Sequence, residues 1–157
     1  MKNDKKGFTL VEIIIAVAIM GLLASAGGVV IHKSVTHARI KAAESELAIY
    51  SCAVLQLAWD TGKWPNGEVR TQAGGNEVWD LSSEAAGLMV EGSDNVYPNW
   101  NGPYYEGVTE DPWGNSYFFD PDYRIDGVMR IVIGSLGPNG VGRNVYEIDN
   151  IYILLDD

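Results

Sequence analysis

The stretch Gly7-Phe8-Thr9-Leu10-Val11-Glu12 is followed by the uncharged run IIIAVAIMGLLASAGGVVI at residues 13–31. The run holds 19 residues. As a helix it would extend roughly 28 Å, close to the hydrocarbon thickness of a bilayer. Glu12 stands at its edge, where a carboxylate is costly in lipid unless it has a partner. We therefore expect a membrane-spanning helix whose acidic residue has a specific use.

The helical pattern continues beyond residue 31. Apolar residues recur at steps of three and four, namely Ile40, Ala43, Leu47, Tyr50, Val54 and Leu57. No proline occurs between residues 8 and 59, and Thr61-Gly62 followed by Trp64-Pro65 is a helix stop. The sequence predicts one helix of about 50 residues, far longer than a globular helix. Its second half has an apolar stripe that a small domain must cover.

Residues 61–157 are expected to form that domain. Three segments are expected to be strands: Tyr117–Phe119, Met129–Ile133 and Ile151–Leu155. A turn around Pro121–Gly127 would join the first two. Residues 66–99 are expected to form a long surface loop with a short helix at Leu81–Val90. The predicted fold class is α+β, with a small antiparallel sheet packed on the C-terminal half of the long helix.

Composition excludes several classes of protein. The formal net charge is −10, which disfavours a nucleic-acid partner. A single cysteine, Cys52, excludes an internal disulfide and a cysteine-rich metal site. We find no nucleophile–base pair, phosphate-binding loop or zinc-ligand spacing. Gly134-Ser135-Leu136-Gly137 lacks the spacing of a hydrolase elbow. The chain is not expected to be an enzyme.

Two interpretations of the N-terminus remain open. A basic start, an apolar run and Ala24-Ser25-Ala26 also fit a secretory signal peptide that is cleaved after Ala26. However, residues 7–12 resemble the prepilin signal of type IV pilins and type II secretion pseudopilins. That resemblance implies cleavage between Gly7 and Phe8, methylation of the new amine, and retention of the helix. It also implies that Glu12 pairs with the Phe8 amine of a neighbouring subunit during assembly.

Three segments of the predicted domain carry a closer resemblance. They are Gly102-Pro103-Tyr104, Asp111-Pro112-Trp113-Gly114-Asn115 and Gly134-Ser135-Leu136-Gly137-Pro138-Asn139-Gly140. Together they resemble the major pseudopilins of type II secretion systems. The resemblance covers roughly residues 7–65 and 100–151, whereas residues 66–99 are longer and different.

The same resemblance implies a calcium ion in the loop at residues 134–150. Its ligands would be the Leu136 carbonyl, Asn139, and either Glu147 or Asp149. Asn139 stands where the family has an aspartate, so binding should be weaker. Calcium accepts carbonyl, amide and carboxylate oxygens in flexible arrays, so these residue types suit it. A plain Gly/Asn turn with solvated acids is the alternative.

The resemblance divides the chain into four segments: a leader at 1–7, a transmembrane and polymerisation helix at 8–31, its amphipathic continuation at 32–60, and a periplasmic head at 61–157. It implies a single-pass inner-membrane protein that assembles into a periplasmic filament for protein export. The partners would be further copies of the chain, a prepilin peptidase, minor pseudopilins, an inner-membrane platform protein and an assembly ATPase. A type IV pilus subunit used for adhesion, motility or DNA uptake is the alternative. A secreted calcium-binding module is a third interpretation.

Overall fold

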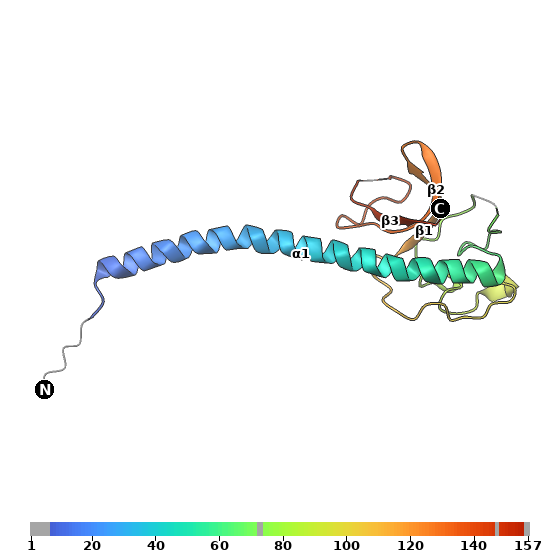
Figure 1. Ribbon diagram of the computed structural model, residues 1–157, viewed down its shortest axis with the longest axis horizontal. Helices are drawn as coiled ribbons and strands as arrows, with labels where there is room; N and C mark the ends of the chain where they lie inside the picture. Colours follow the sequence, from blue (N-terminus) through green and yellow to red (C-terminus); the bar gives the residue numbers. More distant parts are fainter. Residues whose placement is uncertain (1–6, 72–73, 147, 156–157) are drawn as a thin grey trace, which may run out of the picture. The chain divides into compact units, whose positions relative to one another are not determined.

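The computed structural model describes residues 7–71, 74–146 and 148–155, without the side chains at positions 24, 26–30 and 94. The chain is α+β and divides into two compact units, Met1–Ala38 and Arg39–Asp157. Helix α1 (Leu10–Thr61) contributes to both units, and the second unit also holds strands β1, β2 and β3 (Figure 1). The predicted single long helix is confirmed.

Helix α1 ends where the sequence predicts a stop. Gly62 takes a left-handed backbone conformation with φ of +73°, and its N–H donates to the carbonyl of Ala58 at 3.1 Å. This is the C-cap geometry that glycine adopts without strain. The Thr61 hydroxyl also donates to the carbonyl of Leu57 at 2.7 Å. Among the described residues, no helix combines the length and apolarity that crossing a bilayer requires.

The second half of α1 supplies one wall of the core. Five residues of the predicted stripe are fully buried: Ala43, Leu47, Tyr50, Val54 and Leu57. Tyr50 lies among aromatic rings, with its ring centroid 3.9 Å from that of Tyr105 and 5.1 Å from that of Tyr117. The stripe confirms that this half of the helix is covered by the domain that follows it.

The sheet has the order β1-β2-β3, and both pairs of strands are antiparallel. Its strands are β1 (Phe118–Ile125), β2 (Val128–Ser135) and β3 (Ile151–Leu154). The predicted turn at Pro121–Gly127 is wrong in extent, because β1 continues through Pro121 to Ile125. The strand register is irregular between Asp120 and Tyr123. An edge strand with a bulge tolerates a proline, which has no N–H to donate.

Residues 66–99 are irregular, as expected, but the predicted helix at Leu81–Val90 is wrong. The described residues of this segment form two short 3-10 helices, at Glu84–Ala86 and Ser93–Asn95. Gly87 ends the first turn in a left-handed conformation with φ of +67°. Val78 joins this segment to β1 through a two-way backbone pairing with Phe119.

Candidate functional site

The start of α1 is closed by a capping box. The backbone N–H of Thr9 donates to Glu12 Oε2 at 2.8 Å, and its hydroxyl donates to the same oxygen at 2.9 Å. The Glu12 N–H lies 3.3 Å from Thr9 Oγ1 and donates to it. This reciprocal pattern satisfies backbone donors that a helix N-terminus leaves unpaired. Within this single chain, the Glu12 carboxylate is thus held by its own helix start.

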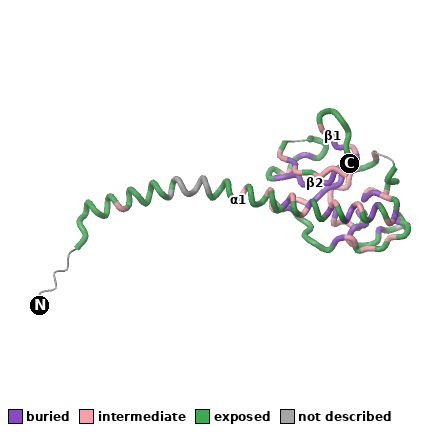
Figure 2. Tube along the Cα trace, in the orientation of Figure 1, coloured by how far each residue is buried: buried purple, intermediate pink, exposed green. Residues whose placement is uncertain are grey.

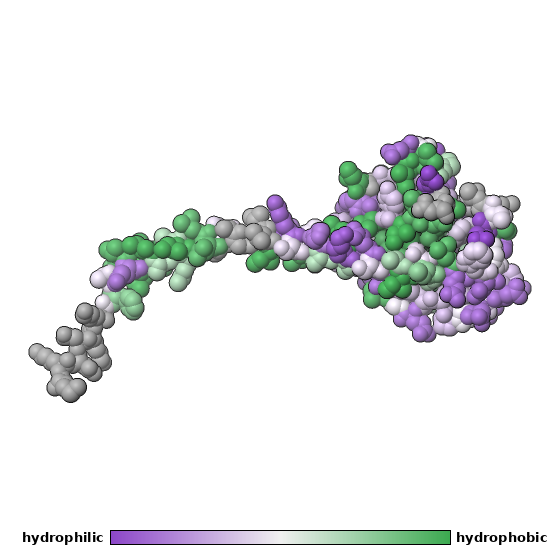
Figure 3. Space-filling view, viewed as in Figure 1, coloured by the Kyte–Doolittle hydropathy of each residue, from purple (hydrophilic) through white to green (hydrophobic). Residues whose placement is uncertain are grey.

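Large apolar side chains next to this cap and along the following helix are exposed. Phe8 is 85% exposed, and ten further large apolar residues up to Leu23 are more than half exposed. They are Leu10, Val11, Ile13, Ile14, Ile15, Val17, Ile19, Met20, Leu22 and Leu23. Figure 2 shows this part of α1 as exposed, and Figure 3 shows it as hydrophobic. Exposed apolar surface on this scale marks a surface that binds other molecules or lipid.

Gly7, where the predicted cleavage falls, is exposed, and a Cβ built there would meet no atom within 4 Å. The three candidate residues Gly7, Phe8 and Glu12 therefore lie together on an accessible segment. The capping role of Glu12 was missed by the sequence reasoning. The spacing Thr-x-x-Glu just before an apolar run is its signal.

The loop after β2 holds the predicted calcium ligands. Leu136 is buried, and Gly137 packs against Asp149: a Cβ on Gly137 would come within 2.3 Å of the Asp149 carbonyl oxygen. Asn139 is exposed, and its side-chain oxygen accepts a hydrogen bond from the Val141 N–H at 2.7 Å. Glu147 lies outside the described residues. The structure thus brings the Leu136–Gly137 backbone and Asp149 together.

A buried aspartate anchors this loop to the rest of the domain. Asp111 is 5% exposed. Its Oδ1 accepts hydrogen bonds from the N–H groups of Trp113 at 2.9 Å and Asn115 at 2.8 Å. Its Oδ2 accepts the Ser135 hydroxyl at 2.5 Å, and Asn115 Nδ2 donates to the Gly137 carbonyl at 3.1 Å. Asp111 therefore ties the Asp-Pro-Trp-Gly-Asn turn to the end of β2.

These contacts limit how a calcium ion would be held in the loop. Calcium takes six to eight oxygen ligands. The described candidates supply one carboxylate, that of Asp149, together with the Leu136 carbonyl. The Asn139 amide oxygen already accepts a backbone hydrogen bond. The residues present therefore fit a weakly held ion, completed by water.

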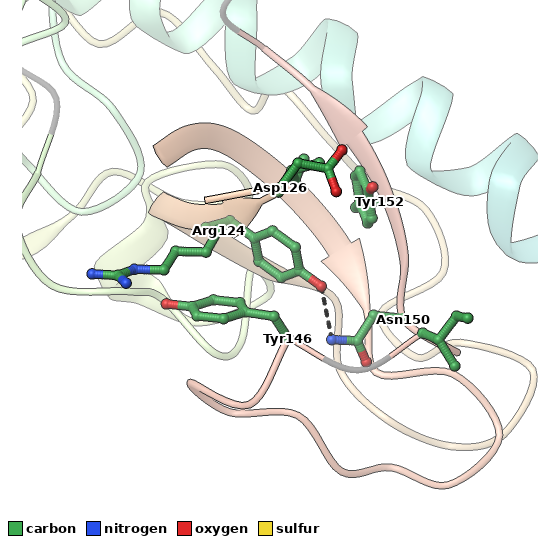
Figure 4. Close-up of a pocket in the computed structure, with 8 residues that line it drawn as sticks. Arg124, Asp126, Tyr146, Asn150 and Tyr152 are labelled. Atoms are coloured by element: carbon green, nitrogen blue, oxygen red, sulfur yellow. Dashed lines mark hydrogen bonds between the residues drawn. The ribbon is translucent and has the colours of Figure 1, made fainter. Parts of the chain in front are cut away.

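An open pocket of about 310 Å³ lies beside β1 and β3 (Figure 4). The Tyr123 hydroxyl accepts a hydrogen bond from Asn150 Nδ2 at 3.0 Å. The rings of Tyr146 and Tyr152 pack on that of Tyr123, with centroid distances of 4.8 Å and 5.2 Å. The described lining combines aromatic and polar side chains with Ile125 and Ile148.

Comparison with known families covers nearly the whole chain. Residues 2–28 match the prokaryotic N-terminal methylation motif. Residues 30–150, well over half of the chain, match the family described as type II secretion system (T2SS), protein G. The chain belongs to the type II secretion system protein G family.

Individual relatives agree with this assignment. A protein named type II secretion system core protein G, from Klebsiella pneumoniae, is 28% identical over 147 residues, covering 93% of this chain and 94% of the relative. A protein of the same name from Pseudomonas aeruginosa is 27% identical over 118 residues, covering 74% and 73%. The crystal structure of the major pseudopilin from the type 2 secretion system of enterohaemorrhagic Escherichia coli matches with a TM-score of 0.53. That match has 19% identity and covers 77% of this chain and 90% of the other, so it shows the fold alone.

These matches confirm two predictions: the α+β fold, shared with a major pseudopilin, and a protein of type II secretion rather than a type IV pilus subunit. Membership of the type II secretion system protein G family agrees with the expectation that this chain is not an enzyme. The roles of Gly7, Phe8 and Glu12, the division into segments and the calcium ion stay predictions.

Proposed function

We propose that this chain is the major subunit of a type II secretion pseudopilus, a periplasmic filament that drives protein export. The observation that carries the proposal is the run of exposed apolar side chains from Phe8 to Leu23, in a chain whose start matches the N-terminal methylation motif. Polymerisation through this helix would cover surface that the chain itself leaves open.

The proposed path begins in the inner membrane. The chain would lie there as a single-pass protein with residues 61–157 in the periplasm. A prepilin peptidase would cut between Gly7 and Phe8 and methylate the Phe8 amine. Gly7 is exposed, and a Cβ built there would meet no atom within 4 Å. This open surrounding suits entry of the segment into a peptidase site. An assembly ATPase and a platform protein would then add the subunit to a filament that minor pseudopilins begin.

Assembly would exchange one partner of Glu12 for another. Before assembly, the carboxylate accepts the Thr9 N–H and hydroxyl. In the filament it would pair with the Phe8 amine of a neighbouring copy. A charge that is buried among apolar helices without its partner strongly destabilises the assembly. The pairing would therefore select the one stagger between subunits in which Glu12 meets the Phe8 amine. The local cap keeps Glu12 satisfied until that partner arrives.

The calcium ion implied for the loop at residues 134–150 is a further part of the proposal. The Leu136 carbonyl, Asn139 and Asp149 would hold it, with Glu147 as the alternative acid. Bound there, the ion would neutralise acid charge and order a loop that has few apolar residues of its own. The anchor at Asp111 already holds the start of this loop in place.

Substitution at Glu12 tests the pairing directly. We expect Glu12→Ala to leave membrane insertion intact and to stop filament assembly, scored by membrane fractionation and by electron microscopy of sheared filaments. Thr9→Ala is the matched control, because it removes the hydroxyl part of the cap and keeps the carboxylate. It should still assemble. Normal filaments from Glu12→Ala would contradict the pairing, and an equal loss in Thr9→Ala would assign the effect to the cap instead.

A further inference from the structure

Three carboxylates come together at β1: Asp120 and Asp122 belong to the strand, and Glu77 comes from the segment at residues 66–99. One oxygen each of Glu77, Asp120 and Asp122 lies within 4.8 Å of the other two. The backbone pairing of Val78 with Phe119 explains the meeting. The two residues exchange backbone hydrogen bonds of 2.9 Å and 2.8 Å, and the two segments are antiparallel. Glu77 therefore comes to lie beside Asp120. Asp122 follows two residues later at the irregular part of the strand.

Asp120 is the unusual member of this group. It is 0% exposed, and its Oδ1 accepts the Asp122 N–H at 2.9 Å. Its Oδ2 is buried and has no hydrogen-bond partner in the part of the chain that the structure describes. Buried polar atoms are nearly always paired, and an unpaired charged one is costly. This oxygen therefore points to a partner that no described side chain supplies.

The neighbouring acids cannot act as that partner while they are ionised. A carboxylate only accepts hydrogen bonds, so Glu77 and Asp122 offer no donor to Asp120 Oδ2. Burial raises the pKa of the Asp120 carboxyl to about 7. The Asp122 N–H opposes this rise, whereas a side-chain hydrogen bond with Asp122 and the like charges of Asp122 and Glu77 add to it. The cluster therefore needs either a shared proton or a cation.

The spacing of the three carboxylates fits a cation. Calcium binds carboxylate oxygens at about 2.3–2.6 Å, so two ligands on opposite sides of one ion lie about 4.6–5.2 Å apart. The separations in the cluster, all within 4.8 Å, are compatible with one ion between the three groups. Glu77 and Asp122 are half-exposed, so an ion can enter from solvent and keep water ligands on that side. Three carboxylates also carry enough charge to neutralise a divalent ion.

We propose that Glu77, Asp120 and Asp122 form a calcium site that fastens the segment at residues 66–99 to strand β1. Glu77 belongs to that segment, and the two aspartates belong to the strand, so the ion bridges them. The site is separate from the loop at residues 134–150, since it shares no ligand with it. It gives the buried Asp120 carboxylate a partner of opposite charge, and it does not depend on filament assembly.

Calcium titration of the full chain in detergent micelles tests this site. The protein is first stripped with a chelator. Calcium chloride is then added, and binding is measured by isothermal titration calorimetry and by the change in the thermal unfolding midpoint. The variants are Glu77→Gln, Asp120→Asn and, as the matched control in the other loop, Asp149→Asn. Glu77→Gln changes a half-exposed side chain, so folding is expected to be retained even if the buried substitution is disruptive.

We expect wild type to show a binding event that raises the unfolding midpoint. Glu77→Gln and Asp120→Asn should each weaken that event at least tenfold, whereas Asp149→Asn should keep it. The proposal is overturned if wild type shows no calcium binding, or if both cluster variants bind as wild type does. It is equally overturned if Asp149→Asn alone abolishes every calcium-dependent change.

Discussion

Ile14 and Leu22, in the first half of α1, are 58% and 72% exposed, whereas Leu47 and Leu57, in the second half, are fully buried. Both halves are apolar and lie in one continuous helix, but only the second is covered by its own chain. The difference teaches that helical propensity alone does not separate the two halves. What separates them is whether the covering surface comes from the same molecule. On the proposed function, other subunits and lipid cover the first half.

The largest expected difference is between two truncations, one leucine in each half of the helix. Leu57→Ala should lower the free energy of unfolding by about 2–5 kcal/mol, because it leaves a cavity in the core. Leu22→Ala should change it by less than about 0.5 kcal/mol, because its side chain is already exposed. Urea unfolding followed by tryptophan fluorescence measures both. Equal losses in the two variants would break the comparison between the halves.

An intermediate effect is expected at Asp111. Asparagine keeps one acceptor oxygen, so Asp111→Asn cannot accept both the backbone N–H groups and the Ser135 hydroxyl. We expect a loss of about 1–3 kcal/mol in the free energy of unfolding. The control is Asp126→Asn, on an exposed turn residue with φ of +51°, a conformation that asparagine also adopts. If Asp111→Asn unfolds at the same urea concentration as this control, Asp111 is not an anchor.

The smallest effect is expected at the helix start. Thr9→Ala removes the N-cap and should cost about 1 kcal/mol locally. The change should appear as faster amide hydrogen exchange over residues 10–13, with the unfolding midpoint of the domain unchanged. Thr36→Ala is the control, because the Thr36 hydroxyl donates to the carbonyl of His32 within the helix and does not cap its start. Unchanged exchange in Thr9→Ala would show that the capping box does not hold the helix start.

Much of the fold could be predicted because its signals are local. The stripe from Ala43 to Leu57 follows helical spacing, and Thr61-Gly62 is a helix stop by its chemistry. Pro121 misled the strand prediction. Its turn-forming tendency was outweighed by its place on an edge strand with irregular register. The real turn is at Asp126-Gly127, where both residues have positive φ.

The acid cluster could not have been predicted in the same way. Asp120 and Asp122 lie two residues apart on β1, but Glu77 reaches them through the pairing of Val78 with Phe119. Nothing in the spacing of residues 66–99 signals that pairing. The capping box, by contrast, can be recognised from Thr9 and Glu12 alone. Contacts between neighbours in sequence are predictable, and contacts made by an irregular segment need the fold.

The mature N-terminus tests the central claim most directly, since the filament depends on retaining the exposed helix. The measurement is the N-terminal sequence and intact mass of the protein isolated from cell membranes. The account predicts a chain that begins at Phe8 and carries one methyl group on its amine. A soluble chain that begins at Gly27 would contradict it, because cleavage after Ala26 removes Glu12 and the apolar surface through which subunits would assemble.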